Sequence, residues 1–121
     1  MSDTKIGLAE NISGVVAYVL GFITGIILLV IEKENKFVRF HAAQSTIVTI
    51  ALIIIYITYM IISFILALIP VVGWIIGIVL GLVVFIGPII LWIFLMFKAY
   101  KGEMYRLPML AEYADKLETM F

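Results

Sequence analysis

The chain contains no cysteine, and this absence removes several classes of protein at once. It excludes a disulfide framework, a thiolate metal site and a cysteine nucleophile. There is one histidine, His41, and it has no second histidine or cysteine at the spacing that a zinc site needs. The sequence therefore predicts no metal site. It also shows us no catalytic or cofactor-binding residue, and we expect no cofactor.

Charge is the second property that the chain has little of. Only 13% of its 121 residues are charged, whereas soluble domains carry about 25%. Eight basic and eight acidic residues give a net charge of zero, which argues against a nucleic-acid partner. Apolar residues make up 65% of the chain, more than a short soluble protein can bury. We therefore expect an integral membrane protein whose first partner is the lipid bilayer.

The apolar residues fall into long uncharged runs. No Asp, Glu, Lys or Arg occurs between Arg39 and Lys98, and another uncharged run covers residues 11–31. A transmembrane helix needs about 20 mostly apolar residues, and Pro70 with Gly73 forms a turn signal that divides the longer run. The sequence thus predicts one all-α membrane domain over residues 1–121, with three transmembrane helices. Their expected bounds are 12–31, 42–69 and 71–98, with a loop at 32–41.

The positions of the basic residues predict an orientation. With three spans, seven of the eight basic residues lie on one side of the membrane and only Lys5 lies on the other. The positive-inside rule assigns the basic side to the cytoplasm, so we expect the N-terminus outside and the C-terminus inside. Apolar residues recur at helical spacing in the tail, residues 103–121. This predicts a short amphipathic helix that lies on the cytoplasmic surface or docks on the loop; the alternative is a frayed tail.

Glycines recur at regular steps in the first and third predicted helices. They are Gly14, Gly21 and Gly25 in the first, and Gly73, Gly77 and Gly81 in the third. Stripes of small residues let two helices approach closely in a membrane. We interpret both stripes as packing faces within one bundle, including against each other. The alternative is that one stripe forms the seam of a homo-oligomer.

Polar residues on one face of the second predicted helix, and at its cytoplasmic end, form the candidate functional cluster. Its members are Arg39, His41, Gln44, Ser45, Thr49, Tyr56 and Ser63. Tyr59 lies on the same face. Isolated polar side chains in a span usually bond to their own helix or to a neighbouring one. The competing hypothesis is a polar groove that faces a partner, a substrate segment or a small aqueous vestibule.

Five segments carry a resemblance to a known family. They are Gly7–Asn11, Leu20–Gly25, Glu32–Ser45, Ile69–Trp74 and Tyr100–Pro108. Together they resemble a widespread family of small prokaryotic membrane proteins of unknown function, related to the chloroplast inner-envelope import component Tic-twenty. The resemblance covers nearly the whole chain. It implies a prokaryotic plasma membrane, no catalytic residue, and a role similar to that of a protein-import translocon component.

These observations lead us to expect a small non-enzymatic membrane protein. It would assist protein translocation, insertion or membrane-complex assembly, with other membrane proteins or translocating chains as partners. One alternative is a structural or lipid-interacting protein that oligomerises through its glycine stripes. Another is a small channel, which would need oligomerisation because one polar face cannot enclose a path. Active transport has little support, since no carboxylate lies within any predicted span.

Overall fold

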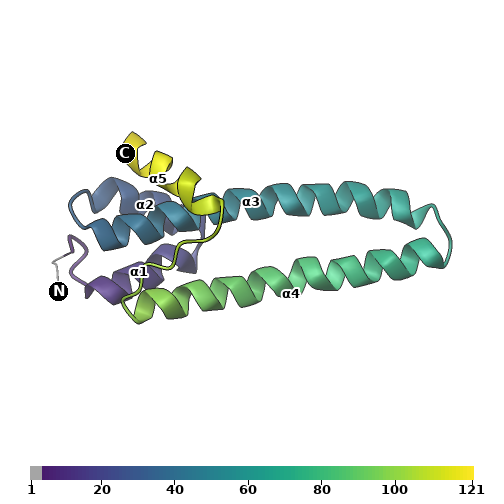
Figure 1. The fold of residues 1–121 in the computed structure, drawn as a ribbon, viewed down its shortest axis with the longest axis horizontal. Helices are drawn as coiled ribbons and strands as arrows, with labels where there is room; N and C mark the ends of the chain where they lie inside the picture. The colour runs from purple at the N-terminus through teal and green to yellow at the C-terminus, as the bar shows by residue number, and fades with distance from the viewer. Residues whose placement is uncertain (1–3) are drawn as a thin grey trace. The chain divides into compact units, whose positions relative to one another are not determined.

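The computed structural model describes residues 4–121, which form five helices and no strand (Figure 1). The helices are α1 (Glu10–Val19), α2 (Phe22–Ile31), α3 (Lys36–Ala67), α4 (Val72–Tyr100) and α5 (Leu110–Met120). The predicted all-α class is therefore confirmed. Within the described part of the chain, α3 and α4 are the two helices that are long and apolar enough to cross a membrane.

The prediction of a first transmembrane helix at residues 12–31 is wrong. This stretch forms α1 and α2, which have ten residues each and are therefore only about 15 Å long. The break lies at Leu20 and Gly21. Gly21 has a φ of 62°, a conformation that glycine adopts at little cost. The chain reverses there and α2 runs back along α1 (Figure 1), so the described residues contain two candidate spans and not three.

The two ends of this α1–α2 hairpin are tied together by the carboxylate of Glu32. It accepts the backbone N–H groups of Lys5 at 2.7 Å and of Ile6 at 3.1 Å. Glu32 itself is only 1% exposed. The segment before α1 therefore lies beside the loop that leads to α3. The expectation of an N-terminus on the opposite side of the membrane depended on a span at 12–31, and it loses that basis.

The other two predicted helices correspond to α3 and α4. The helix α3 begins at Lys36 because the side-chain Oδ1 of Asn35 accepts the backbone N–H of Val38 at 3.0 Å and caps the helix start. Most of the predicted loop at 32–41 is therefore helical. Pro70 lies in the turn between α3 and α4, and Pro88 lies inside α4, both as the sequence predicts.

The chain divides into two compact units. We call residues 51–91 the central unit, and the described residues up to Ile50 together with residues 92–121 the terminal unit. In the central unit, the hydroxyl of Tyr59 on α3 donates to the Gly77 carbonyl on α4 at 3.0 Å. The indole N–H of Trp74 donates to the Ala67 carbonyl at 3.0 Å. Both bonds connect α3 to α4 within this unit.

The terminal unit has its own apolar core. The core residues are Ala17, Leu28, Leu29, Phe37, Val38, Ala42, Ala43 and Ala114. Ala114 belongs to α5, and Ala111 of the same helix is also buried. The expected amphipathic tail helix is thus present and docks on the unit. It occupies only the second part of the predicted range 103–121, because residues 103–109 are not helical.

The glycines of both predicted stripes lie against α3 of the same chain. A Cβ added at Gly25 would lie 2.8 Å from the Ala42 carbonyl oxygen, and one at Gly14 would lie 2.9 Å from the Phe37 ring. In the central unit, Gly81 faces the Tyr59 hydroxyl, and Gly73 and Gly77 face Leu66. The prediction that Gly14, Gly21 and Gly25 form a stripe on one helix is wrong, because Gly21 lies between α1 and α2.

Candidate functional site

Three side chains form a buried hydrogen-bonded chain near the start of α3. The Nε2 of His41 lies 2.8 Å from the Glu103 carbonyl oxygen and must carry the hydrogen, since a carbonyl only accepts. In the neutral ring the Nδ1 then accepts the Tyr18 hydroxyl hydrogen, at 2.7 Å. Tyr18 in turn accepts a hydrogen bond from the Gln44 amide at 3.0 Å. His41 and Gln44 are fully buried, and Tyr18 nearly so.

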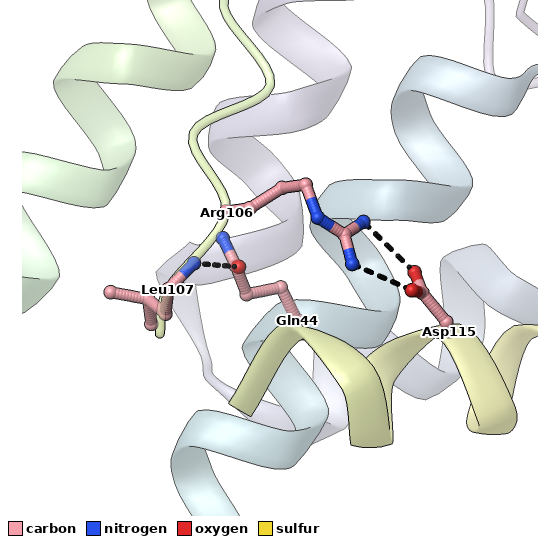
Figure 2. Close-up of polar contacts among 4 residues, drawn as sticks. All are labelled: Gln44, Arg106, Leu107 and Asp115. Carbon is pink, nitrogen blue, oxygen red and sulfur yellow. Dashed lines mark hydrogen bonds and ion pairs between the residues drawn. The ribbon is translucent and has the colours of Figure 1, made fainter. Parts of the chain in front are cut away.

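Gln44 and His41 hold the segment that follows α4 against α3. The Gln44 amide nitrogen also donates to the Tyr105 carbonyl at 2.9 Å. Its Oε1 accepts the backbone N–H of Leu107 at 3.0 Å (Figure 2). Together with the bond from His41 to Glu103, this pairs residues 103–107 with α3. The segment has no helix or strand bonds of its own here, so these side chains satisfy its backbone.

Arg39 joins the C-terminal ends of two helices. Its guanidinium donates to the Leu29 carbonyl of α2 at 2.8 Å and to the Glu118 carbonyl of α5 at 2.7 Å. The last four carbonyls of a helix have no partner within that helix. They also carry the negative end of the helix dipole, which a cation stabilises. Arg39 thus fixes both helices to α3, and it is 8% exposed.

Of the remaining members of the predicted cluster, Ser45 follows Gln44 directly, whereas Thr49, Tyr56 and Ser63 lie further along α3. Ser45 donates to the Gly21 carbonyl at 3.1 Å, and Thr49 donates to the Ser45 carbonyl of its own helix at 2.8 Å. Tyr56 and Ser63 belong to the central unit, where Ser63 bonds to the Met60 carbonyl of its own helix. The structure therefore brings together Arg39, His41, Gln44 and Ser45, which all bond to other segments of the chain.

Sequence reasoning missed three residues of this site. The sequence predicts Tyr18 within an apolar span and Glu32 within the loop at 32–41. The sequence predicts Trp92 only as part of the span at 71–98, but its indole N–H donates to the Tyr18 carbonyl. The sequence does contain a signal for Glu32. It is the first residue of Glu32–Ser45, a segment that carries the family resemblance and includes the start of the polar cluster. Spacing within one helix could not have found Tyr18, because its partners lie on another helix.

A charged pocket of about 500 Å³ opens on the terminal unit. It is lined by Lys33, Glu34, Lys36, Arg39, Phe40, Met104, Arg106, Asp115, Glu118 and Thr119. Its four basic and three acidic side chains come from α3, α5 and the segments beside them. Arg106 and Asp115 form a two-pronged ion pair, with N–O distances of 3.1 and 2.6 Å (Figure 2). Both partners are about half exposed.

We expect the ion pair to control the pKa of the Asp115 carboxyl. The hydrogen bond from Arg106 lowers the pKa of this carboxyl below its ordinary value. We expect Arg106→Gln to raise the pKa of Asp115 back towards that value, which a carboxyl-carbon NMR titration would measure. Lys116→Gln is the control, since Lys116 lies over the Tyr113 ring and should leave the Asp115 pKa unchanged. An Asp115 pKa that Arg106→Gln does not move would contradict the assignment.

The Ser13 hydroxyl is the one buried side-chain polar atom without a hydrogen-bond partner among the described residues. A buried hydroxyl of this kind costs free energy, and alanine is also the better helix former. We therefore expect Ser13→Ala to raise the free energy of unfolding by about 1 kcal/mol. Detergent-denaturation midpoints of the two proteins would measure it. Destabilisation by the same amount would show that the hydroxyl has a partner.

Comparison with known proteins identifies the family of this chain. Residues 3–113 match the model of the magnetosome magnetite crystal formation protein family. The chain belongs to this family. A UPF0132 membrane protein of Methanocaldococcus jannaschii is 44% identical over 96% of this chain and 94% of its own length. Another from Archaeoglobus fulgidus is 37% identical over 90% of this chain and 95% of its own length.

The relatives support part of what the sequence predicted. They are named as membrane proteins and come from archaea, which agrees with a small prokaryotic membrane family. No solved structure matches the chain. Among residues 4–121, no group of three or more His, Cys, Asp or Glu side chains is placed to hold a metal ion.

Proposed function

We propose that this member of the magnetosome magnetite crystal formation protein family is a non-enzymatic membrane module that assists the assembly of membrane protein complexes. The insertion or translocation of other chains is the form of this role that the resemblance to Tic-twenty favours. One observation carries the proposal. The polar side chains that could have served a reaction, Arg39, His41 and Gln44, are occupied by the chain's own backbone.

The polar cluster thus builds a folded terminal unit, and this unit exposes the charged pocket described above. A pocket of about 500 Å³ lies in the size range of ligand sites. Its mixed charges suit a polypeptide segment that carries both signs. A purely anionic ligand would meet the carboxylates of Glu34, Asp115 and Glu118. The proposed partner is therefore a protein segment near the membrane surface.

The proposal includes an orientation in a prokaryotic plasma membrane. All eight basic residues lie within residues 5–39 and 98–116. In a protein with the two spans α3 and α4, both of these segments flank the spans on the same side. The positive-inside rule assigns this side to the cytoplasm. Both termini and the charged pocket then face the cytoplasm.

Site-specific photo-crosslinking in native membranes tests the proposed partner. A photoreactive residue in place of Met104, which lines the pocket, should capture a defined membrane protein. The matched control is Tyr113, which is similarly exposed on α5 but does not line the pocket. Charge reversal by Lys36→Glu should reduce the yield from position 104. Capture of lipid alone, or of the same proteins from both positions, would contradict the proposal.

A lipid-interacting role is the second candidate, and one observation favours it. The central unit has a mainly apolar pocket of about 230 Å³, lined by residues of α3 and α4 that include Tyr59, Ile62 and Leu80. Such a groove suits a lipid acyl chain. Mass spectrometry of the purified protein should then detect retained lipid, and Leu80→Trp should reduce it by filling the groove. Equal retention by both proteins would remove the support for this role.

A further inference from the structure

The outer surface of the α1–α2 hairpin is apolar and exposed. Leu20 at the turn is 59% exposed, and Ile23, Ile27 and Val30 along α2 are each 49% exposed. The helix α2 has no charged residue along its ten positions. Proteins in water rarely leave an apolar surface of this extent uncovered. Something apolar must therefore cover the hairpin.

The backbone at the hairpin turn is satisfied from within the protein. The Gly21 carbonyl accepts the Ser45 hydroxyl, and the Ala17 carbonyl accepts the Thr24 hydroxyl at 3.2 Å. The Tyr18 carbonyl accepts the indole N–H of Trp92. Non-helical backbone occurs at membrane depth only where other protein groups bond to it. These three side chains meet that condition at the place where the helix is interrupted.

The length and the ends of the hairpin determine how it can meet a membrane. Each helix is about 15 Å long, half of the roughly 30 Å hydrocarbon core. Polar residues stand at both ends of the hairpin, and Glu32 ties these ends together. A segment of this kind can enter a leaflet and return, but it cannot cross the bilayer.

We propose that α1 and α2 form a re-entrant hairpin whose turn, from Val19 to Ile23, lies among the lipid acyl chains of one leaflet. It enters and leaves through the membrane surface on which both termini lie. The exposed apolar side chains of the hairpin then contact the lipid hydrocarbon. The inference is independent of the protein partner proposed for the charged pocket.

Single-cysteine labelling tests this directly, because the chain has no cysteine of its own. We choose Lys5→Cys, Leu20→Cys, Glu34→Cys and Leu68→Cys, all at exposed positions. A membrane-impermeant maleimide is applied to sealed vesicles of either orientation. We expect Lys5→Cys and Glu34→Cys to react from the same side, and Leu68→Cys from the other. Leu20→Cys should react at least tenfold more slowly from either side and recover in detergent.

Each other result would overturn the inference. Labelling of Lys5→Cys and Glu34→Cys from opposite sides would show that residues 10–31 cross the membrane. Fast labelling of Leu20→Cys from the side of the termini would place the turn in water. Reaction of Leu68→Cys from that same side would show that α3 does not cross the membrane. As a second readout, a fluorophore on Leu20→Cys should be quenched by lipids brominated in their acyl chains, while one on Glu34→Cys should not.

Discussion

Replacing Gln44 by leucine should lower the free energy of unfolding by about 3 kcal/mol, the upper part of the range for single substitutions. Leucine keeps much of the volume but removes the bonds to Tyr18, Tyr105 and Leu107. A buried polar group that loses its partner costs about 1–3 kcal/mol. We expect the segment after α4 to detach. Denaturant titration would measure the stability, and limited proteolysis would measure the release of residues 103–121.

Thr58→Val is the control for this experiment. The Thr58 hydroxyl also makes a hydrogen bond, but to the Ile54 carbonyl of its own helix. Its loss should change the stability by less than about 0.5 kcal/mol, as for most exposed positions. If Gln44→Leu had the stability and the proteolysis rate of the unmodified protein, Gln44 would not hold the C-terminal segment.

The second large effect is expected at Gly25, where α2 lies against α3. In Gly25→Ala the new Cβ would lie 2.8 Å from the Ala42 carbonyl oxygen and 2.6 Å from the Thr46 hydroxyl. The carbonyl oxygen cannot yield without moving the α3 backbone, and the hydroxyl can yield only by breaking its own bond to that carbonyl. Overpacking of this kind costs about 1–3 kcal/mol. We expect a loss of about 2 kcal/mol in the free energy of unfolding, measured by denaturant titration.

Gly87→Ala provides a control with the opposite sign. Gly87 lies inside α4, and nothing lies within 4 Å of the position that its Cβ would take. Alanine should therefore stabilise the helix by up to about 1 kcal/mol through its higher helix propensity. Equal effects at Gly25 and Gly87 would show that α2 does not pack closely on α3.

The helices α3 and α4 could be predicted from the sequence because uncharged runs of this length have few other structures. The pair α1 and α2 could not. Composition makes no distinction between one helix of twenty apolar residues and two helices of ten. The difference depends on a single residue, Gly21, and on partners for the broken backbone at Ser45 and Trp92. Those partners are remote in sequence, so spacing does not show them.

The candidate site was predicted in part for a similar reason. Periodicity and position at the cytoplasmic end of one helix identified Arg39, His41, Gln44 and Ser45. All four are buried and bond to other segments of the chain. The same periodicity added Tyr56 and Ser63, which lie in the other unit. Periodicity shows which residues share a helix face, but it does not show that α3 passes from one unit into the other after Ile50. The sequence also could not show that backbone carbonyls of α2, α5 and the C-terminal segment are the partners.

The central claim is that residues 10–31 turn back on themselves, and one distance tests it most directly. Spin labels on Lys5→Cys and Glu34→Cys should lie within about 20 Å of each other, because Glu32 bonds to the Lys5 backbone. A continuous helix over 12–31 would separate them by about 30 Å or more. Labels on Val72→Cys and Ile90→Cys, both within α4, calibrate the measurement at about 27 Å. A Lys5–Glu34 distance equal to or longer than this reference would contradict the account.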